Sequence, residues 1–73
     1  MSEDLLVATA RGYEDSAREL DRAAAHLRIA AEHFRAHDVP RGCAHAFAAH
    51  GHIYVVQRQI DEHAVEHRTK ARV

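Results

Sequence analysis

The stretch CAHAFAAHGHIYVV, residues 43–56, decides how this chain is organised. At about 100° per residue, as in an α-helix, its apolar residues separate into two stripes. One stripe comprises Ala46, Ala49, Ile53, Val56 and, beyond the stretch, Ile60, and the nearly opposite one comprises Phe47, Gly51, Tyr54 and Val55. A helix that is apolar on two sides must be covered on both, and 73 residues offer only one other long helix. We therefore expect the stripe with Phe47 to pack against a second copy of the chain.

Upstream of this stretch, Pro40 is the only proline of the sequence and sets the position of a turn. Proline disfavours helical backbone at the preceding residue and has no N–H to donate, but it suits the first turn of a new helix. We predict a helix over residues 3–37, a turn over 38–40 and a second helix over 41–71. The fold class is therefore all-α, an antiparallel two-helix hairpin in one domain.

The first predicted helix carries large residues at every seventh position, with alanines three residues before each later one. The large residues are Leu6, Tyr13, Leu20, Leu27 and Phe34, and the alanines are Ala10, Ala17, Ala24 and Ala31. This heptad pattern is typical of helices that pack along their whole length. We expect it to form the seam of the hairpin, with Leu27 beside Ile53, Leu20 beside Ile60 and Ala23 beside Val56. Two such hairpins would form a four-helix bundle, so the expected partner is the chain itself.

Composition excludes several other partners. Ten lysines and arginines nearly balance eleven aspartates and glutamates, so the chain lacks the basic surface that nucleic acid attracts. It also lacks a run of about 20 apolar residues that could cross a membrane, and it begins without a recognisable signal peptide. A single cysteine fits a reducing compartment. We expect a soluble, cytoplasmic protein that binds neither nucleic acid nor membranes.

Eight histidines are the main chemical feature of the sequence. Unperturbed imidazoles titrate near pH 6.5, so full protonation would change the formal charge from −1 to +7. His33 with His37, and His63 with His67, are spaced i, i+4 and can each present two imidazoles to one ion. Cys43 should lie near His37 across the turn. These five residues are the predicted metal ligands, and imidazole with thiolate suits Zn, Cu or Ni.

A structural interpretation competes with the metal sites. Cys43 can be a small buried thiol beside solvated histidines, and His50, between the two apolar stripes, can be a hydrogen-bonded histidine near the subunit interface. The run HAVEH, residues 63–67, matches the H-x-x-E-H pattern of inverted zinc proteases but lacks the cleft and larger fold that such enzymes need. We expect no enzymatic activity. Two functions remain open: transition-metal binding through histidine pairs, and a structural or adaptor module with pH-responsive histidines.

The segments AAEHFRAHDVPRGCAHAFAAHGHI and DEHAVEH resemble a group of small, histidine-rich bacterial helical proteins of unknown function. Those proteins carry runs similar to AHxAHGHH. The matching positions here are Ala44, His45, Ala49, His50, Gly51 and His52, whereas Ile53 and Tyr54 stand where the group has further histidines. The resemblance implies a helical fold and brings no activity with it.

Overall fold

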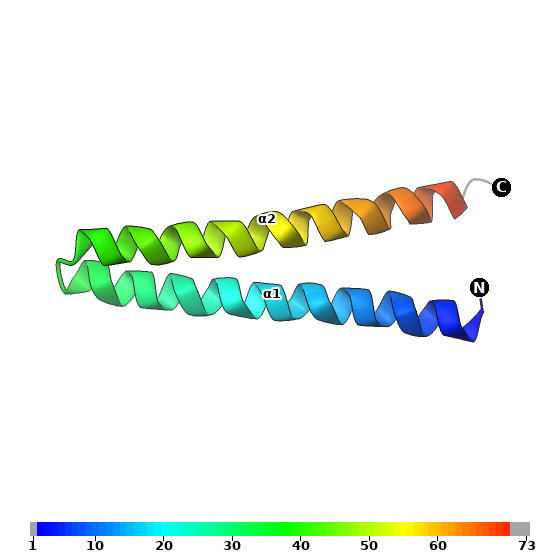
Figure 1. Ribbon diagram of the computed structural model, residues 1–73, viewed down its shortest axis with the longest axis horizontal. Helices are drawn as coiled ribbons and strands as arrows, with labels where there is room; N and C mark the ends of the chain where they lie inside the picture. Colours follow the sequence, from blue (N-terminus) through cyan, green and yellow to red (C-terminus); the bar gives the residue numbers. More distant parts are fainter. Residues whose placement is uncertain (1, 71–73) are drawn as a thin grey trace.

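Two long antiparallel helices make up the protein in the computed structural model, which describes residues 2–70 and the side chains of residues 2–65. Helix α1 spans Glu3–Arg35 and helix α2 spans Val39–Lys70. They lie side by side, with the two ends of the chain at one end of the molecule and the turn at the other (Figure 1). The predicted all-α hairpin is confirmed. The first helix ends two residues earlier than expected and the second begins two residues earlier, while position 71 lies outside the described residues.

The first turn of α1 is stabilised by its own sequence. The Ser2 hydroxyl accepts a hydrogen bond from the Leu5 backbone N–H at 3.1 Å, which satisfies one of the free donors at the helix start. Glu3 and Asp4 place negative charge at the positive end of the helix dipole.

The turn between the helices takes three residues, 36–38. The His37 N–H donates to the Phe34 carbonyl and the Asp38 N–H donates to the His33 carbonyl, the paired bonds of a Schellman cap. His37 occupies the left-handed position of this cap with φ of 61°, a backbone conformation that glycine adopts more easily. The Asp38 carboxylate then accepts a hydrogen bond from the Arg41 N–H at 3.2 Å and so caps α2.

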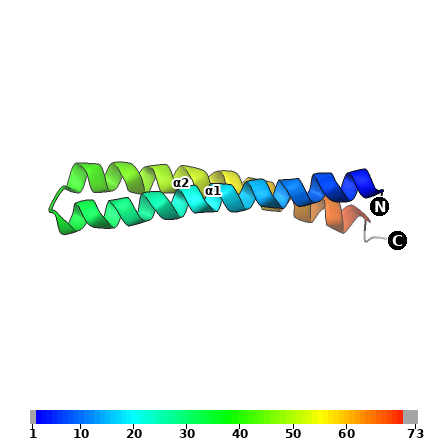
Figure 2. The same ribbon diagram turned by 90° about the horizontal axis from the view of Figure 1, so that it is seen from below.

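The two helices wind gently around each other, since they cross when the molecule is turned by 90° (Figure 2). The molecule measures 55 × 20 × 12 Å and is therefore a flat slab, one helix thick. Within the described part of the chain, no helix has a stretch both long and apolar enough to span a membrane.

Small and polar side chains form the seam between the helices. In both helices they recur at alternating spacings of four and three residues, the pattern of a helix pair packed along its length. Helix α1 contributes Gly12, Ser16, Glu19, Ala23, His26, Ala30 and His33, and α2 contributes Gly42, His45, Ala49, His52, Val56, Gln59 and His63. The buried apolar core consists of four of them, Ala23, Ala30, Ala49 and Val56. The core is thin because its side chains are small.

The predicted seam of large residues is wrong. Leu20 and Leu27 are 46% and 49% exposed, and Ile53 and Ile60 remain similarly exposed. Ser16 bonds to Gln59, whereas the predicted register would have placed it opposite Ala64. The physical reason is that glycine, alanine and serine allow the helix backbones to approach closely, so the small-residue heptad forms the contact instead. Ala23 and Val56 are both buried, while their predicted contact with each other stays a prediction.

The large heptad of α1 therefore lies outside the seam, about 100° around the helix from it. We call this set the outer stripe: Leu6, Ala10, Tyr13, Ala17, Leu20, Ala24, Leu27, Ala31 and Phe34. Ile53 and Ile60 follow the seam residues His52 and Gln59 just as Leu20 and Leu27 follow Glu19 and His26. A pair of antiparallel helices has an approximate two-fold axis perpendicular to the plane that contains both helices. Residues that come one position after a seam residue therefore lie on the same broad face in both helices, so Ile53 and Ile60 share a face with the outer stripe. That face of the hairpin is apolar and exposed.

Candidate functional site: a histidine ladder

Four histidines and one glutamate form a continuous series of contacts along the seam. In spatial order they are Glu19, His52, His26, His45 and His33, alternating between α1 and α2. We call this set the histidine ladder. Its members occupy the polar positions of the seam heptad and face the opposite helix. On each helix, neighbouring members are seven residues apart, which is about two helical turns.

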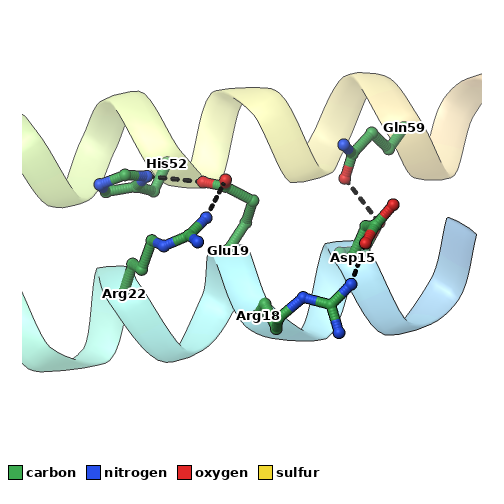
Figure 3. Close-up of polar contacts among 7 residues, drawn as sticks. Asp15, Arg18, Glu19, Arg22, His52 and Gln59 are labelled. Carbon is green, nitrogen blue, oxygen red and sulfur yellow. Dashed lines mark hydrogen bonds and ion pairs between the residues drawn. The ribbon is translucent and has the colours of Figure 1, made fainter. Parts of the chain in front are cut away.

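Glu19 anchors one end of the ladder. Its Oε2 lies 2.6 Å from Nδ1 of His52 and its Oε1 lies 2.5 Å from Nη1 of Arg22 (Figure 3). The hydrogen bond with His52, together with the nearby Arg22 charge, lowers the pKa of the Glu19 carboxyl below its ordinary value. Glu19 is therefore held as a carboxylate that fixes the orientation of the His52 ring.

The centre of the ladder is a contact between two imidazoles from opposite helices. Nδ1 of His26 lies 3.0 Å from Nδ1 of His45. One of these nitrogens must donate a proton and the other must accept it, because two unprotonated or two protonated nitrogens would repel each other at this distance. The pair thus holds a single proton between α1 and α2.

Stacked rings flank this central pair on both sides. The His52 ring stacks on His26 with centroids 5.5 Å apart, and the His33 ring stacks on His45 with centroids 5.4 Å apart. The interplanar angles are 15° and 17°, so the rings are nearly parallel. His26 and His45 are therefore restrained by neighbours as well as by their own contact.

Two further contacts continue the polar seam toward the open end of the hairpin. The Ser16 hydroxyl, in a residue that is 4% exposed, donates to Oε1 of Gln59 at 2.6 Å. Beyond it, the His63 ring stacks on Tyr13 at 4.7 Å and packs against Gly12. A Cβ atom on Gly12 would lie 2.9 Å from that ring, so glycine leaves the space that the imidazole fills.

The predicted metal ligands have different surroundings. His33 belongs to the ladder, His37 is exposed in the turn and Cys43 is a half-buried free thiol. His63 contacts Tyr13, and the side chain of His67 lies outside the described residues. Among the described side chains, no three of histidine, cysteine, aspartate and glutamate converge where one metal ion could sit. His50 is exposed on the single hairpin, and its place near a subunit interface stays a prediction.

The comparisons with known proteins found no matching family model, no similar curated protein and no similar solved structure.

Sequence spacing missed His26, His45 and His52 as a group. Spacing along the sequence pairs histidines on one helix, whereas the ladder pairs them across two. The available signal was their place in the small-residue heptad: His26 and His33 are three residues after Ala23 and Ala30, and His52 is three after Ala49. Residues in that register face the partner helix.

Proposed function

We propose that this chain is a non-enzymatic helical module that associates with a second copy of itself through the outer stripe, giving a four-helix bundle. The observation that carries the proposal is that the strongest apolar heptad of the sequence lies on the exposed face of the hairpin. A heptad of this kind is typical of a helix packed along its length. Its alanines allow close approach, and its leucines supply the area to be buried.

The thin core of the hairpin supports the same proposal. Among the described residues, no large side chain is fully buried. Small domains whose own core is insufficient commonly gain stability from oligomerisation. Covering the exposed half of each large residue on the apolar face contributes roughly 0.7 to 1.5 kcal/mol per side chain. A second copy offers an apolar face of the same length and chemistry.

The charges along the edge of the outer stripe favour an antiparallel arrangement of the α1 helices of the two copies. Four residues at a spacing of seven follow this edge: Glu14 and Asp21, then Arg28 and Arg35. None of them forms an ion pair within the described part of the hairpin. An antiparallel neighbour brings the acidic half of one helix against the basic half of the other, whereas a parallel one aligns like charges.

The proposed interface differs from the one expected at Phe47, Gly51 and Tyr54. Phe47 is 76% exposed and Tyr54 is also exposed, and nothing lies near Gly51. These residues form a small patch on the outer side of α2, which provides a second candidate surface and a matched control. The free thiol of Cys43 favours a reducing compartment, and we place the assembly in the cytoplasm.

Sedimentation velocity on the purified chain tests the interface. We expect wild type to sediment as a dimer and Leu20→Glu/Leu27→Glu to lose the dimer, because both leucines are half exposed in the hairpin and would bury charge only in the assembly. Phe47→Glu should sediment as wild type. A folded wild-type monomer, or a dimer that Phe47→Glu disrupts and the leucine variant does not, contradicts the proposal.

A charge exchange tests the orientation of the two copies. Arg28→Glu should weaken the antiparallel dimer by placing a second acidic group opposite Asp21 of the other copy, and adding Asp21→Arg should restore it. In a parallel dimer Arg28 would face its own copy, so the rescue would be absent.

A further inference from the structure

The two central imidazoles of the histidine ladder meet head-on. Nδ1 of His26 lies 3.0 Å from Nδ1 of His45, and the ring centroids are 5.3 Å apart. The centroid separation exceeds the nitrogen separation by little more than one ring radius on each side, so the two nitrogens lie almost on the line between the rings. One lone pair therefore points at one N–H, which is the geometry of a hydrogen bond between α1 and α2.

This contact limits how many protons the pair can hold. In the neutral pair, one ring donates from Nδ1, and the other accepts at Nδ1 and carries its own proton on Nε2. A first added proton binds Nε2 of the donor ring and leaves a charge-assisted N–H···N bond in place. A second added proton must bind Nδ1 of the acceptor ring. Two N–H groups and two positive charges would then face each other at 3.0 Å, so the contact has to break.

We propose that the pair of His26 and His45 is a pH-sensitive contact that holds α1 and α2 together with one added proton or none, and releases them when both imidazoles are protonated. His26 and His45 are half-buried in the middle of the seam, so solvent protons reach the rings and their separation disturbs the helix contact itself. This device is a property of the single hairpin and is independent of self-association through the outer stripe.

The charged and titratable groups around the pair come from both helices. Helix α1 contributes His33, Glu19 and Arg22, and α2 contributes His52 and Arg41. His33 and His52 stack on the pair, so a proton on either of them places a further positive charge beside it. Glu19 bonds to His52 and Arg22, so its negative charge compensates those groups and not a second proton on the pair.

The direction of the pH effect follows from counting protons in the folded and unfolded states. In the unfolded chain the two imidazoles are independent, and free imidazoles bind protons near pH 6.5. Well below that pH, the unfolded chain holds two added protons on these residues and the folded hairpin holds one. The free energy of unfolding decreases as pH falls wherever the unfolded state binds more protons. The pair therefore keeps the seam closed at neutral pH and weakens it in acid.

Replacing the pair by asparagines tests the proposal. An asparagine amide has a donor and an acceptor near the position of Nδ1 but does not titrate. Urea unfolding of the full chain at one protein concentration, from pH 7.5 to 5, compares wild type with His26→Asn/His45→Asn. Between pH 6 and 5, we expect the unfolding constant of wild type to rise roughly five- to tenfold relative to that of the double variant, as one excluded proton requires.

Two further variants serve as controls. His45→Asn alone should remove the same pH dependence, because an amide can pair with His26 in either protonation state. His37→Asn removes an exposed histidine in the turn, at a positive φ that asparagine also adopts, and should keep the pH dependence of wild type. Equal pH dependence in wild type and the folded double variant would overturn the proposal, and so would an equal loss of pH dependence in His37→Asn.

A measurement on wild type alone decides the question if the asparagine variants do not fold. Nitrogen-15 NMR of the histidine rings reports which nitrogen of each ring is protonated. At neutral pH we expect one of the two Nδ1 atoms to be protonated, and coupling between the two Nδ1 atoms across their hydrogen bond. On acidification, the signals of the paired helices should lose intensity before both rings are fully protonated. A folded hairpin in which His26 and His45 are both fully protonated contradicts the proposal.

Discussion

The ring of Phe34 lies directly against the backbone of Gly42. A Cβ atom on Gly42 would come within 2.6 Å of Phe34 Cε2, closer than real contacts allow, whereas a Cβ on Gly51 would meet nothing within 4 Å. Both glycines lie inside α2, where glycine costs about 1 kcal/mol relative to alanine. The two positions differ in what surrounds them, and Gly42 also lies in the first turn of α2 whereas Gly51 lies in its middle.

We expect Gly51→Ala to stabilise the protein by about 1 kcal/mol through helix propensity. Gly42→Ala should be less stable than Gly51→Ala by at least about 1 kcal/mol, since crowding the Phe34 ring offsets the same gain. Urea unfolding at one fixed protein concentration measures both. Equal stability of the two variants would show that the ring moves aside without cost.

His37 offers a stabilising substitution at the turn. Its φ of 61° is costly for a residue with a Cβ atom, and the Schellman cap commonly has glycine there. His37→Gly should raise the free energy of unfolding by about 1 kcal/mol. The control is His50→Gly, which introduces glycine into the regular helix α2 and should lower it by about as much. A destabilised His37→Gly variant would mean that the imidazole makes a needed contact.

The interactions of the Glu19 carboxylate should make the free energy of unfolding fall in acid. Its folded-state pKa is lowered by the hydrogen bond with His52 and by Arg22, so the resulting stability is present above the ordinary value of 4.5. It is lost as pH falls from there through the lowered pKa. We expect Glu19→Gln to be less stable than wild type at neutral pH, and the difference to shrink below about pH 4. Chemical unfolding from pH 7 to 3 checks this, and a constant difference would contradict it.

The bond between Ser16 and Gln59 should contribute measurably to helix pairing. A double-mutant cycle of Ser16→Ala and Gln59→Ala isolates it from the helix propensity of alanine. We expect a coupling energy of about 0.5 to 1.5 kcal/mol, as for a partly buried neutral hydrogen bond. The pair Gln57 and Asp61, exposed on one helix, serves as a control and should show a smaller coupling.

The helices and the turn could be predicted from the sequence because their signals are local. Ser2, Pro40 and the heptad of α1 each act on neighbouring residues, and the helix ends differ from prediction by two residues at the turn. Which residues form the seam depends on both helices together and not on signals within one of them. Leucine and alanine at positions such as Leu20 and Ala24 form an obvious heptad, and hydrophobicity alone favours burying it. Close approach of Ser16, Gly42 and Ala49 decides the contact instead.

The candidate site was less predictable for the same reason. Spacing along one helix identifies pairs such as His63 and His67, but the contact between His26 and His45 depends on the register of two helices. That register is set by where small residues meet, through contacts such as the Phe34 ring on Gly42. One helical turn of slip would separate His26 from His45 and leave each ring beside a different neighbour.

The spacing of the seam contacts along the chain has a consequence for how the hairpin can fold. The contacts along the seam span progressively longer segments of chain, from 19 residues between His26 and His45 and 33 between Glu19 and His52 in the ladder to 43 between Ser16 and Gln59 beyond it. Once the turn has formed, each contact between the helices brings the residues of the next contact close together. Forming the next contact therefore closes only a short additional loop. The two helices can therefore pair step by step, starting at the turn and continuing toward the other end of the hairpin. Folding in small loop-closing steps favours a fast rate, and the proposed docking of a second copy would then be the slower, concentration-dependent event.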